Sequence, residues 1–289
     1  MDWRRSRRSD NVVEGGAGGG RLGRGGGLGL GGIALVVGLG LALGRSPAEI
    51  LGFLLQLSGG GGYEEPATPR EATPEQAGQV EFVKAILGST EDVWGSLFSR
   101  DSPYPRPRLV LFAGVVDSAC GRATAAVGPF YCARDSQVYL DLDFFREMDR
   151  RFHASGDLAR AYVIAHEVGH HVQNVTGEMR EIERARRRGV PMEGADGLSV
   201  RQELQADCFA GVWARRAQDQ LHWLEAGDVE GALAAATAIG DDALQKQSRG
   251  YVVPVSFTHG TSAQRVRWFK AGMARGNVDD CDTLGAAAL

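Results

Sequence analysis

The chain has 289 residues, a formal net charge of −4 and 43% hydrophobic residues, which suffices for one large globular domain with shorter appendages. The slight acidic excess argues against a protein that binds nucleic acid. The 41 glycines gather near the N-terminus, so this bias describes one segment and not the whole fold.

The first part of the chain predicts a membrane anchor. Residues 1–24 are polar and arginine-rich, whereas residues 25–44 carry no charge. About 20 such residues can just cross a bilayer core, so we expect a transmembrane helix over 25–44, with an apolar extension to residue 57. A cleaved signal peptide fits less well, because the apolar run is too long and lacks an A-x-A site.

The distribution of arginine around this segment predicts its orientation. Six arginines precede the segment and only Arg45 directly follows it. The positive-inside rule then predicts a single-pass protein of the cell membrane, with residues 1–24 as a cytoplasmic basic tail and the remainder extracytoplasmic. Gly40 and Gly44 form a G-x-x-x-G pair, which predicts weak helix–helix self-association. The Gly, Pro and Glu content of residues 58–74 is that of a flexible linker, and residues 75–289 form the expected globular domain.

Within the domain, hydrophobic periodicity predicts many helices and few strands. The expected strands cover 108–116 and 137–142; the expected helices cover 73–87, 91–98, 144–152, 158–188, 200–220 and 228–238, and a last helix follows Thr261. Gln264 completes a capping box with Thr261 at the start of that last helix. The predicted fold class is therefore α+β, dominated by helices, with a small sheet.

The stretch HEVGHH, residues 166–171, carries the clearest chemical signal. Residues four apart share one face of a helix, so His166 and His170 point together as two imidazole ligands of one metal ion must. Glu167 lies beside them, where its carboxylate can take a proton from water. This is H-E-x-x-H, the helix of zinc metallopeptidases. His171 points elsewhere, and we expect it to pack or to form hydrogen bonds.

A catalytic zinc needs a third protein ligand and an open position for water. In one class of zinc peptidase the third ligand is a histidine six residues after the second histidine of the motif, but here Thr176 occupies that position. Glu203 and Asp207 lie four apart in RQELQADCFAGVWA, hence on one helical face. A carboxylate ligand followed one turn later by an aspartate is the arrangement of glutamate-zincins, in which the aspartate accepts a hydrogen bond from a liganding imidazole. Other candidates fit less well because they follow the histidines too closely, among arginines: Glu178, Glu181 and Glu183.

These motifs give the chain a specific resemblance. It resembles the neutral zinc metallopeptidase family of bacterial single-pass membrane proteins in HEVGHHVQ, ELQADCFAGVWA, SACG, GPFYC, VYLDLDFF, FTHGTSAQRVRWF and the N-terminal MDWRRSRRSDNV. The resemblance spans nearly the whole chain. It implies a zincin-like peptidase fold and one catalytic zinc ion held by His166, His170 and Glu203.

Two further groups of residues complete the predicted site and its frame. His259, in FTHGTS, is a candidate stabiliser of the developing oxyanion, with Tyr251 as a weaker alternative and a structural cap as the other reading. The four cysteines allow three pairings. Cys120 and Cys132 flank a hairpin-like segment, which leaves Cys208 for Cys281, although a free thiol at Cys208 stays open.

The predicted reaction is hydrolysis of peptide bonds. Zinc would lower the pKa of a bound water, Glu167 would take its proton, and strand 137–142 would offer an edge to an extended peptide substrate. The expected partners are therefore a peptide or protein substrate and the lipid bilayer around the N-terminal anchor. Two alternatives remain: a membrane-tethered binding or scaffold protein with a structural zinc, against which the presence of Glu167 argues, and a zinc hydrolase of non-peptide amides.

Overall fold

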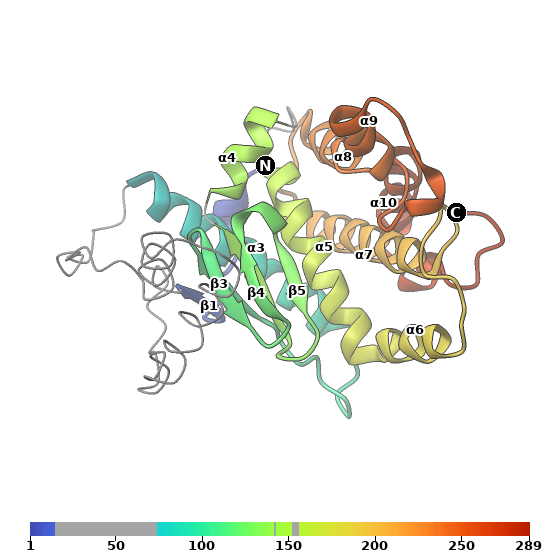
Figure 1. Ribbon diagram of the computed structural model, residues 1–289. Helices are drawn as coiled ribbons and strands as arrows, with labels where there is room; N and C mark the ends of the chain where they lie inside the picture. The colour runs from blue at the N-terminus through green and yellow to red at the C-terminus, as the bar shows by residue number, and fades with distance from the viewer. Residues whose placement is uncertain (15–73, 142, 152–155) are drawn as a thin grey trace, which may run out of the picture. The chain divides into compact units, whose positions relative to one another are not determined.

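The computed structural model describes residues 1–14, 74–141, 143–151 and 156–289, and in Figure 1 the helices α5, α7 and α10 lie to one side of a small sheet. The described helices outnumber the described strands, so the helix-rich α+β class predicted from the sequence is confirmed for this part of the chain. The structure adds short elements that periodicity did not reveal: β1 (Val12–Glu14), β4 (Gly121–Thr124), β5 (Phe130–Cys132) and α9 (Asp241–Arg249).

The main sheet has the strand order β1–β2–β6–β5, where β2 is Arg108–Phe112 and β6 is Gln137–Asp141. β1, β2 and β6 run parallel, and β5 pairs antiparallel with β6. β5 covers β6 at Gln137, Val138 and Tyr139, so the expectation that residues 137–142 form an edge is wrong for these three residues. The terminal strand is β5, which is too short to show alternation. The predicted strand 108–116 divides at Gly114, whose φ of 78° ends β2 before β3 (Val115–Ser118) pairs with β4.

Two helix boundaries differ from the sequence prediction, and a glycine explains each difference. α3 runs without a break from Pro74 to Leu97, through Gly88. A Cβ on Gly88 would lie 2.3 Å from the carbonyl oxygen of Arg7, so this glycine admits the N-terminal segment and does not end the helix. The predicted helix 158–188 divides into α5 (Asp157–Thr176) and α6 (Glu178–Arg187) because Gly177 adopts the left-handed conformation, with φ 104°.

The remaining helices are α4 (Phe144–Arg151), α7 (Leu198–Leu221), α8 (Asp228–Ala238) and α10 (Ser262–Arg275). The backbone of α7 lies close to those of α5 and α10. A Cβ on Gly211 of α7 would lie 2.1 Å from the carbonyl oxygen of Phe269, and one on Gly272 of α10 would lie 1.9 Å from that of Cys208. On α5, a Cβ on Gly169 would lie 3.0 Å from Ala206. These contacts bring α5, α7 and α10 together at the residues of the predicted site. The capping box of Thr261 and Gln264 at the start of α10 is confirmed.

Residues 1–14 are an integral part of this domain. β1 pairs with β2, and the Met1 ammonium lies 2.6 Å from a carboxylate oxygen of Glu225. The carboxylate of Glu91, which is 1% exposed, accepts hydrogen bonds from Ser9 and Asn11 and pairs with Arg7. The first residues of the chain therefore supply a strand to the sheet and the counter-charge for a buried carboxylate.

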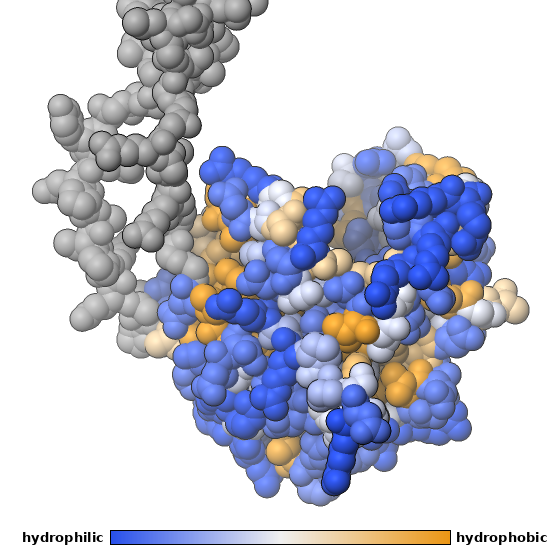
Figure 2. All heavy atoms as spheres, turned by 90° about the horizontal axis from the view of Figure 1, so that it is seen from below, coloured by the Kyte–Doolittle hydropathy of each residue, from blue (hydrophilic) through white to orange (hydrophobic). Residues whose placement is uncertain are grey.

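The predicted membrane anchor and localisation require correction. In the described part of the chain no helix is long and apolar enough to cross a membrane. The longest of these helices, α3, α5 and α7, each carry several charged side chains. The face in Figure 2 is mainly hydrophilic, with separate apolar patches. The expected span over 25–44, its extension to 57 and its G-x-x-x-G pair lie outside the described residues.

The sheet itself contradicts the predicted orientation. A single crossing between residues 14 and 74 would place β1 and β2, which are hydrogen-bonded to one another, on opposite sides of a bilayer. The arginine count that led to this orientation has another explanation, because Arg7 and Arg8 pair with acidic side chains of α3.

Candidate metal centre

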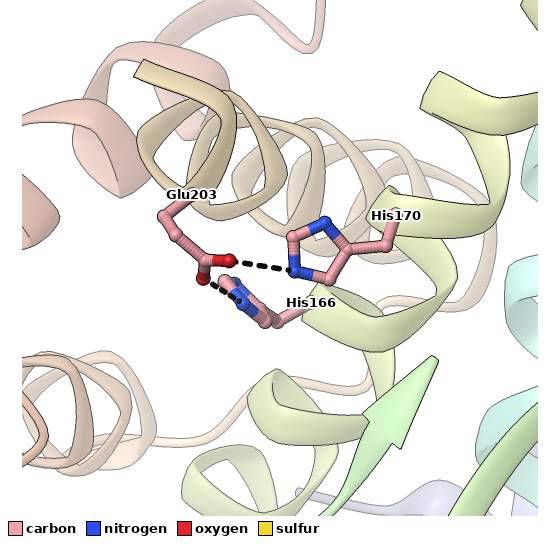
Figure 3. A group of neighbouring side chains, drawn as sticks. All are labelled: His166, His170 and Glu203. Carbon is pink, nitrogen blue, oxygen red and sulfur yellow. Dashed lines mark hydrogen bonds and ion pairs between the residues drawn. The ribbon is translucent and has the colours of Figure 1, made fainter. Parts of the chain in front are cut away.

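Three side chains from two helices converge on one point (Figure 3). His166 and His170 project from α5 toward Glu203 of α7. The Nε2 atom of His166 lies 3.1 Å from Oε2 of Glu203, and that of His170 lies 3.4 Å from Oε1. The structure thus brings together the three residues predicted as ligands.

The arrangement fits a zinc ion. Ligand atoms at 2.0–2.1 Å from a tetrahedral centre are roughly 3.3 Å apart, which agrees with the separations of 3.1 and 3.4 Å. The three ligand atoms all lie within 4.8 Å of one another. Two imidazoles and one carboxylate are also the donor set of a zinc site that keeps a position open.

The charges in this cluster balance one another. Burial opposes protonation of His166, but the carboxylates of Asp207 and Glu203 overcome it and raise its pKa to about 10. Burial likewise opposes ionisation of Glu203, yet the two histidines hold its pKa well below 4.5. Without a cation, protons on the imidazoles therefore provide the positive charge that this carboxylate requires.

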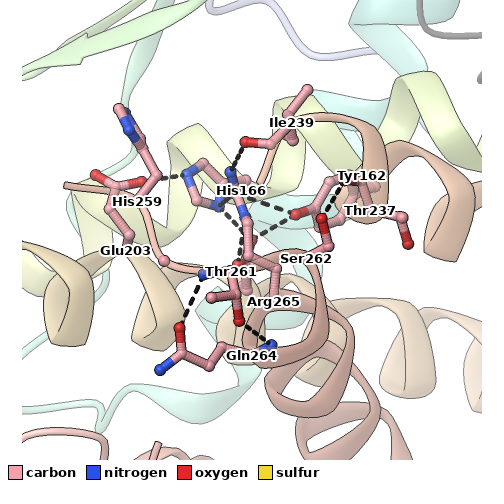
Figure 4. Close-up of polar contacts among 12 residues, drawn as sticks. Tyr162, His166, Glu203, Thr237, Ile239, His259, Thr261, Ser262, Gln264 and Arg265 are labelled. Atoms are coloured by element: carbon pink, nitrogen blue, oxygen red, sulfur yellow. Dashed lines mark hydrogen bonds and ion pairs between the residues drawn. The ribbon is translucent and has the colours of Figure 1, made fainter. Parts of the chain in front are cut away.

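Asp207 supports His166 from behind and also contacts Tyr162 and Arg265, which Figure 4 shows beside His166. Its Oδ1 lies 2.8 Å from Nδ1 of His166, the nitrogen that faces away from Glu203. The same oxygen accepts a hydrogen bond from the hydroxyl of Tyr162, and the guanidinium of Arg265 donates to both carboxylate oxygens at 2.8 Å. Burial opposes ionisation of Asp207, but Arg265 and His166 lower its pKa to about 2. The position predicted for Asp207 from the four-residue spacing is therefore the one observed.

His170 has a different support, which the sequence analysis missed. Its Nδ1 lies 2.9 Å from Oε1 of Gln173, which is fully buried. The amide of Gln173 donates to the carbonyl oxygen of Gln202 at 2.7 Å and to Oε1 of Gln205 at 2.9 Å. These bonds fix the orientation of the Gln173 amide, so Nδ1 of His170 must donate to it and Nε2 is left to bind a metal.

The sequence analysis missed three residues that support the histidines: Tyr162, Gln173 and Arg265. Helical spacing could have identified the first two of them. Tyr162 lies one turn before His166, and Gln173 nearly one turn after His170, so both share the faces of the histidines they support. Arg265 lies on α10, whose close approach to α7 depends on Gly211 and Gly272. Nothing in the local sequence pairs Arg265 with Asp207.

Glu167 differs from every other carboxylate of the centre. It is 7% exposed, yet its carboxylate forms no hydrogen bond or ion pair with any other described residue. It lies near enough to His170 for its charge to favour protonation of that imidazole. A buried carboxylate without a partner is costly, and such groups are typical of sites where the partner is a substrate or water.

His259 lies in the segment that leads into α10. The carboxylate of Asp241 holds this segment by accepting backbone N–H bonds from Thr258, His259 and Gly260 at 2.7, 2.7 and 3.0 Å. Asp241 also lies 3.3 Å from Nδ1 of His259 and raises the pKa of the imidazole. The negative charge of Glu203 raises this pKa further, which places His259 within electrostatic reach of the metal ligands. Its side chain is half exposed.

His171 and the cysteines have structural positions, as predicted. Nδ1 of His171 lies 3.1 Å from the hydroxyl of Tyr131 on β5, its Nε2 contacts the carbonyl oxygen of Pro105, and burial lowers its pKa. The predicted disulfides, Cys120–Cys132 and Cys208–Cys281, are both present. The second joins α7 to the C-terminal segment one residue after Asp207.

Comparison with known proteins agrees with this site. The model of a family described as "Putative neutral zinc metallopeptidase" matches residues 1–284, and the chain belongs to this family. It is 42% identical to "Uncharacterized protein YpfJ" of Escherichia coli over 292 aligned residues, which cover 99% of both chains. It is 43% identical to "Uncharacterized protein Rv2575" of Mycobacterium tuberculosis over 217 residues, covering 72% of this chain and 71% of that protein. No solved structure matches the chain.

Proposed function

We propose that this protein is a peptidase that holds one zinc ion between His166, His170 and Glu203 and uses Glu167 as its general base. The observation that carries the proposal is the contrast between two carboxylates. Glu203 is engaged by both imidazoles at 3.1 and 3.4 Å, whereas Glu167 has no partner among the described residues. A purely structural metal site needs ligands but no such base.

The residues around the ligands have separate tasks in this reaction. Zinc, when bound, would lower the pKa of a coordinated water and polarise the scissile carbonyl. Glu167 would accept the proton of the attacking water and pass it to the leaving amine. Asp207 and Gln173 would hold the Nδ1 atoms of the two histidines, so that each Nε2 stays directed at the metal position.

His259 would stabilise the oxyanion that forms on the carbonyl oxygen. Asp241 and Thr258 engage its Nδ1 atom at 3.3 and 2.9 Å, which leaves Nε2 available. Because Asp241 raises the pKa of His259, the imidazole retains a proton on Nε2 to higher pH than an isolated histidine would. A cation with a free donor is suited to a developing negative charge.

The substrate of this proposal is an extended peptide, and the terminal strand β5 is the edge that could pair with it. The side chain of Tyr131 on β5 contacts His171 and Asn174 on α5, so this edge lies against the helix that carries the metal ligands. Pairing of backbones along a sheet edge orients a substrate with little demand on its side chains.

Elemental analysis of the purified full-length chain tests the metal assignment. One zinc per chain is expected, with loss on changing His166, His170 or Glu203 to Ala. Full zinc content in Glu203→Ala would refute its role as the third ligand. Glu167→Ala should retain zinc and lose hydrolysis, and an active Glu167→Ala variant would refute the general-base role.

A further inference from the structure

A cavity of about 740 Å³ lies apart from the metal ligands, between α3, α5, α6, α7 and the C-terminal segment. Its size is within the range of small-ligand and peptide side-chain sites. Trp94, Phe209 and Val278 form part of its apolar lining. None of the three ligands, nor Glu167 or His259, lines it.

The charged residues of the cavity all have one sign. Four carboxylates line it: Glu178, Glu181, Asp279 and Asp282. No lysine or arginine lines it among the described residues, although Arg180 and Arg184 line an adjoining hollow together with Glu178 and Glu181. An apolar lining with an acidic border is complementary to a cation attached to an apolar group.

The wall formed by the C-terminal segment is held in place by a disulfide and by hydrogen bonds. The disulfide Cys208–Cys281 joins it to α7, and Cys281 itself lines the cavity. The guanidinium of Arg201 donates to the carbonyl oxygens of Thr283 and Ala286 at 2.7 and 2.8 Å. The amide of Gln205 donates to the carbonyl oxygen of Cys281 at 3.3 Å. A wall anchored in this way loses little freedom when a ligand binds.

Polar side chains lie among the apolar lining. Ser99 and Ser102 line the cavity and offer hydroxyl groups for hydrogen bonds.

We propose that this cavity is a second binding site, which takes a peptide segment with a basic side chain next to an apolar one. The apolar side chain would lie against Trp94, Phe209 and Val278, and the guanidinium or ammonium group would meet the carboxylates at the border. The proposal goes beyond the peptidase function and holds without it, because none of His166, Glu167, His170, Glu203 and His259 lines the cavity.

The test uses the full-length chain and two blocked tetrapeptides, acetyl-Leu-Arg-Leu-Arg-amide and its citrulline counterpart, which has the same shape without the charge. Chelator present throughout prevents hydrolysis, and binding is followed by calorimetry. The arginine peptide should bind at least about tenfold more tightly than the citrulline peptide. Glu181→Gln and Asp279→Asn should each weaken its binding about threefold, as expected for exposed ion pairs. Glu230→Gln, at an exposed position of α8, is the matched control and should bind as wild type.

Equal binding of both peptides would overturn the proposal, as would unchanged affinity in the double variant of Glu181 and Asp279. Equal weakening by Glu230→Gln would also overturn it, because binding would then follow net charge and not this cavity. The zinc content and hydrolysis of the same variants report separately on the metal centre, so failure of one account leaves the other intact.

Discussion

The ion pair between Asp207 and Arg265 provides the sharpest test of how the metal centre is supported. Both residues are buried, at 0% and 2% exposure, and the guanidinium donates two hydrogen bonds of 2.8 Å to the carboxylate. Removing one partner of such a pair leaves a buried charge uncompensated, which costs about 3–5 kcal/mol. Arg265→Met and Asp207→Asn should each lower the free energy of unfolding by roughly this amount.

The double variant should not lose the sum of the two costs, because it removes both charges. We expect a coupling energy of about 3 kcal/mol, within the range measured for residues of one network. Urea unfolding of the metal-free protein gives all four free energies. A double variant whose loss equals the sum of the single losses to within about 0.5 kcal/mol would refute this reasoning.

Zinc affinity separates the tasks of the two residues. Asp207→Asn removes the charge beside Nδ1 of His166, so zinc affinity should fall about 10–100-fold, and turnover should slow. Arg265→Met retains the carboxylate and should weaken zinc affinity less than Asp207→Asn does. Competition with a chelator measures both. If Asp207→Asn matches wild type in affinity and turnover, Asp207 is only a helix residue.

Three further predictions concern other parts of the domain. Gln173→Leu should keep the fold but weaken zinc affinity about 10–100-fold through His170, measured by chelator competition, and unchanged affinity would argue against this support. Removing residues 1–14 should cost at least about 3 kcal/mol in the free energy of unfolding, because the pairing of β1 and the hydrogen bonds and ion pair of Glu91 are lost; equal stability by urea unfolding would contradict this. The pKa of His259 is raised from 6.5, so its ion pair stabilises fully below that pH and is lost as pH rises through the raised value. In metal-free protein His259→Gln should therefore cost up to about 1 kcal/mol near pH 6 and less near pH 9, and a difference independent of pH would refute the pairing.

Much of the metal centre could be predicted from the sequence because its key residues share helices. The spacing of His166 and His170, and of Glu203 and Asp207, fixes which side chains point together before any tertiary contact is known. Arg265 could not be found in this way, because its pairing with Asp207 depends on how α10 packs against α7. The close approach of these helices is set by glycines whose neighbours are distant in sequence.

The role of the N-terminal segment could not be predicted from the sequence. Its arginines resemble a basic tail beside a membrane span, because composition gives the charge of a segment but not the residues with which it pairs. In the folded domain Arg7 pairs with the buried Glu91, and β1 adds a parallel strand to β2. Contacts between residues more than 70 positions apart leave no periodic signal in either segment. The three residues of β1 are likewise too few to show alternation.

Hydrolysis of a mixed peptide library by the full-length protein tests the central claim most directly. The account predicts cleavage products in mass spectra when zinc is present, their loss on addition of a chelator, and their return when zinc is restored. Glu167→Gln with full zinc content should give no cleavage under the same conditions. Products that persist with chelator, or that form at the wild-type rate in zinc-loaded Glu167→Gln, would contradict a zinc peptidase with Glu167 as its base.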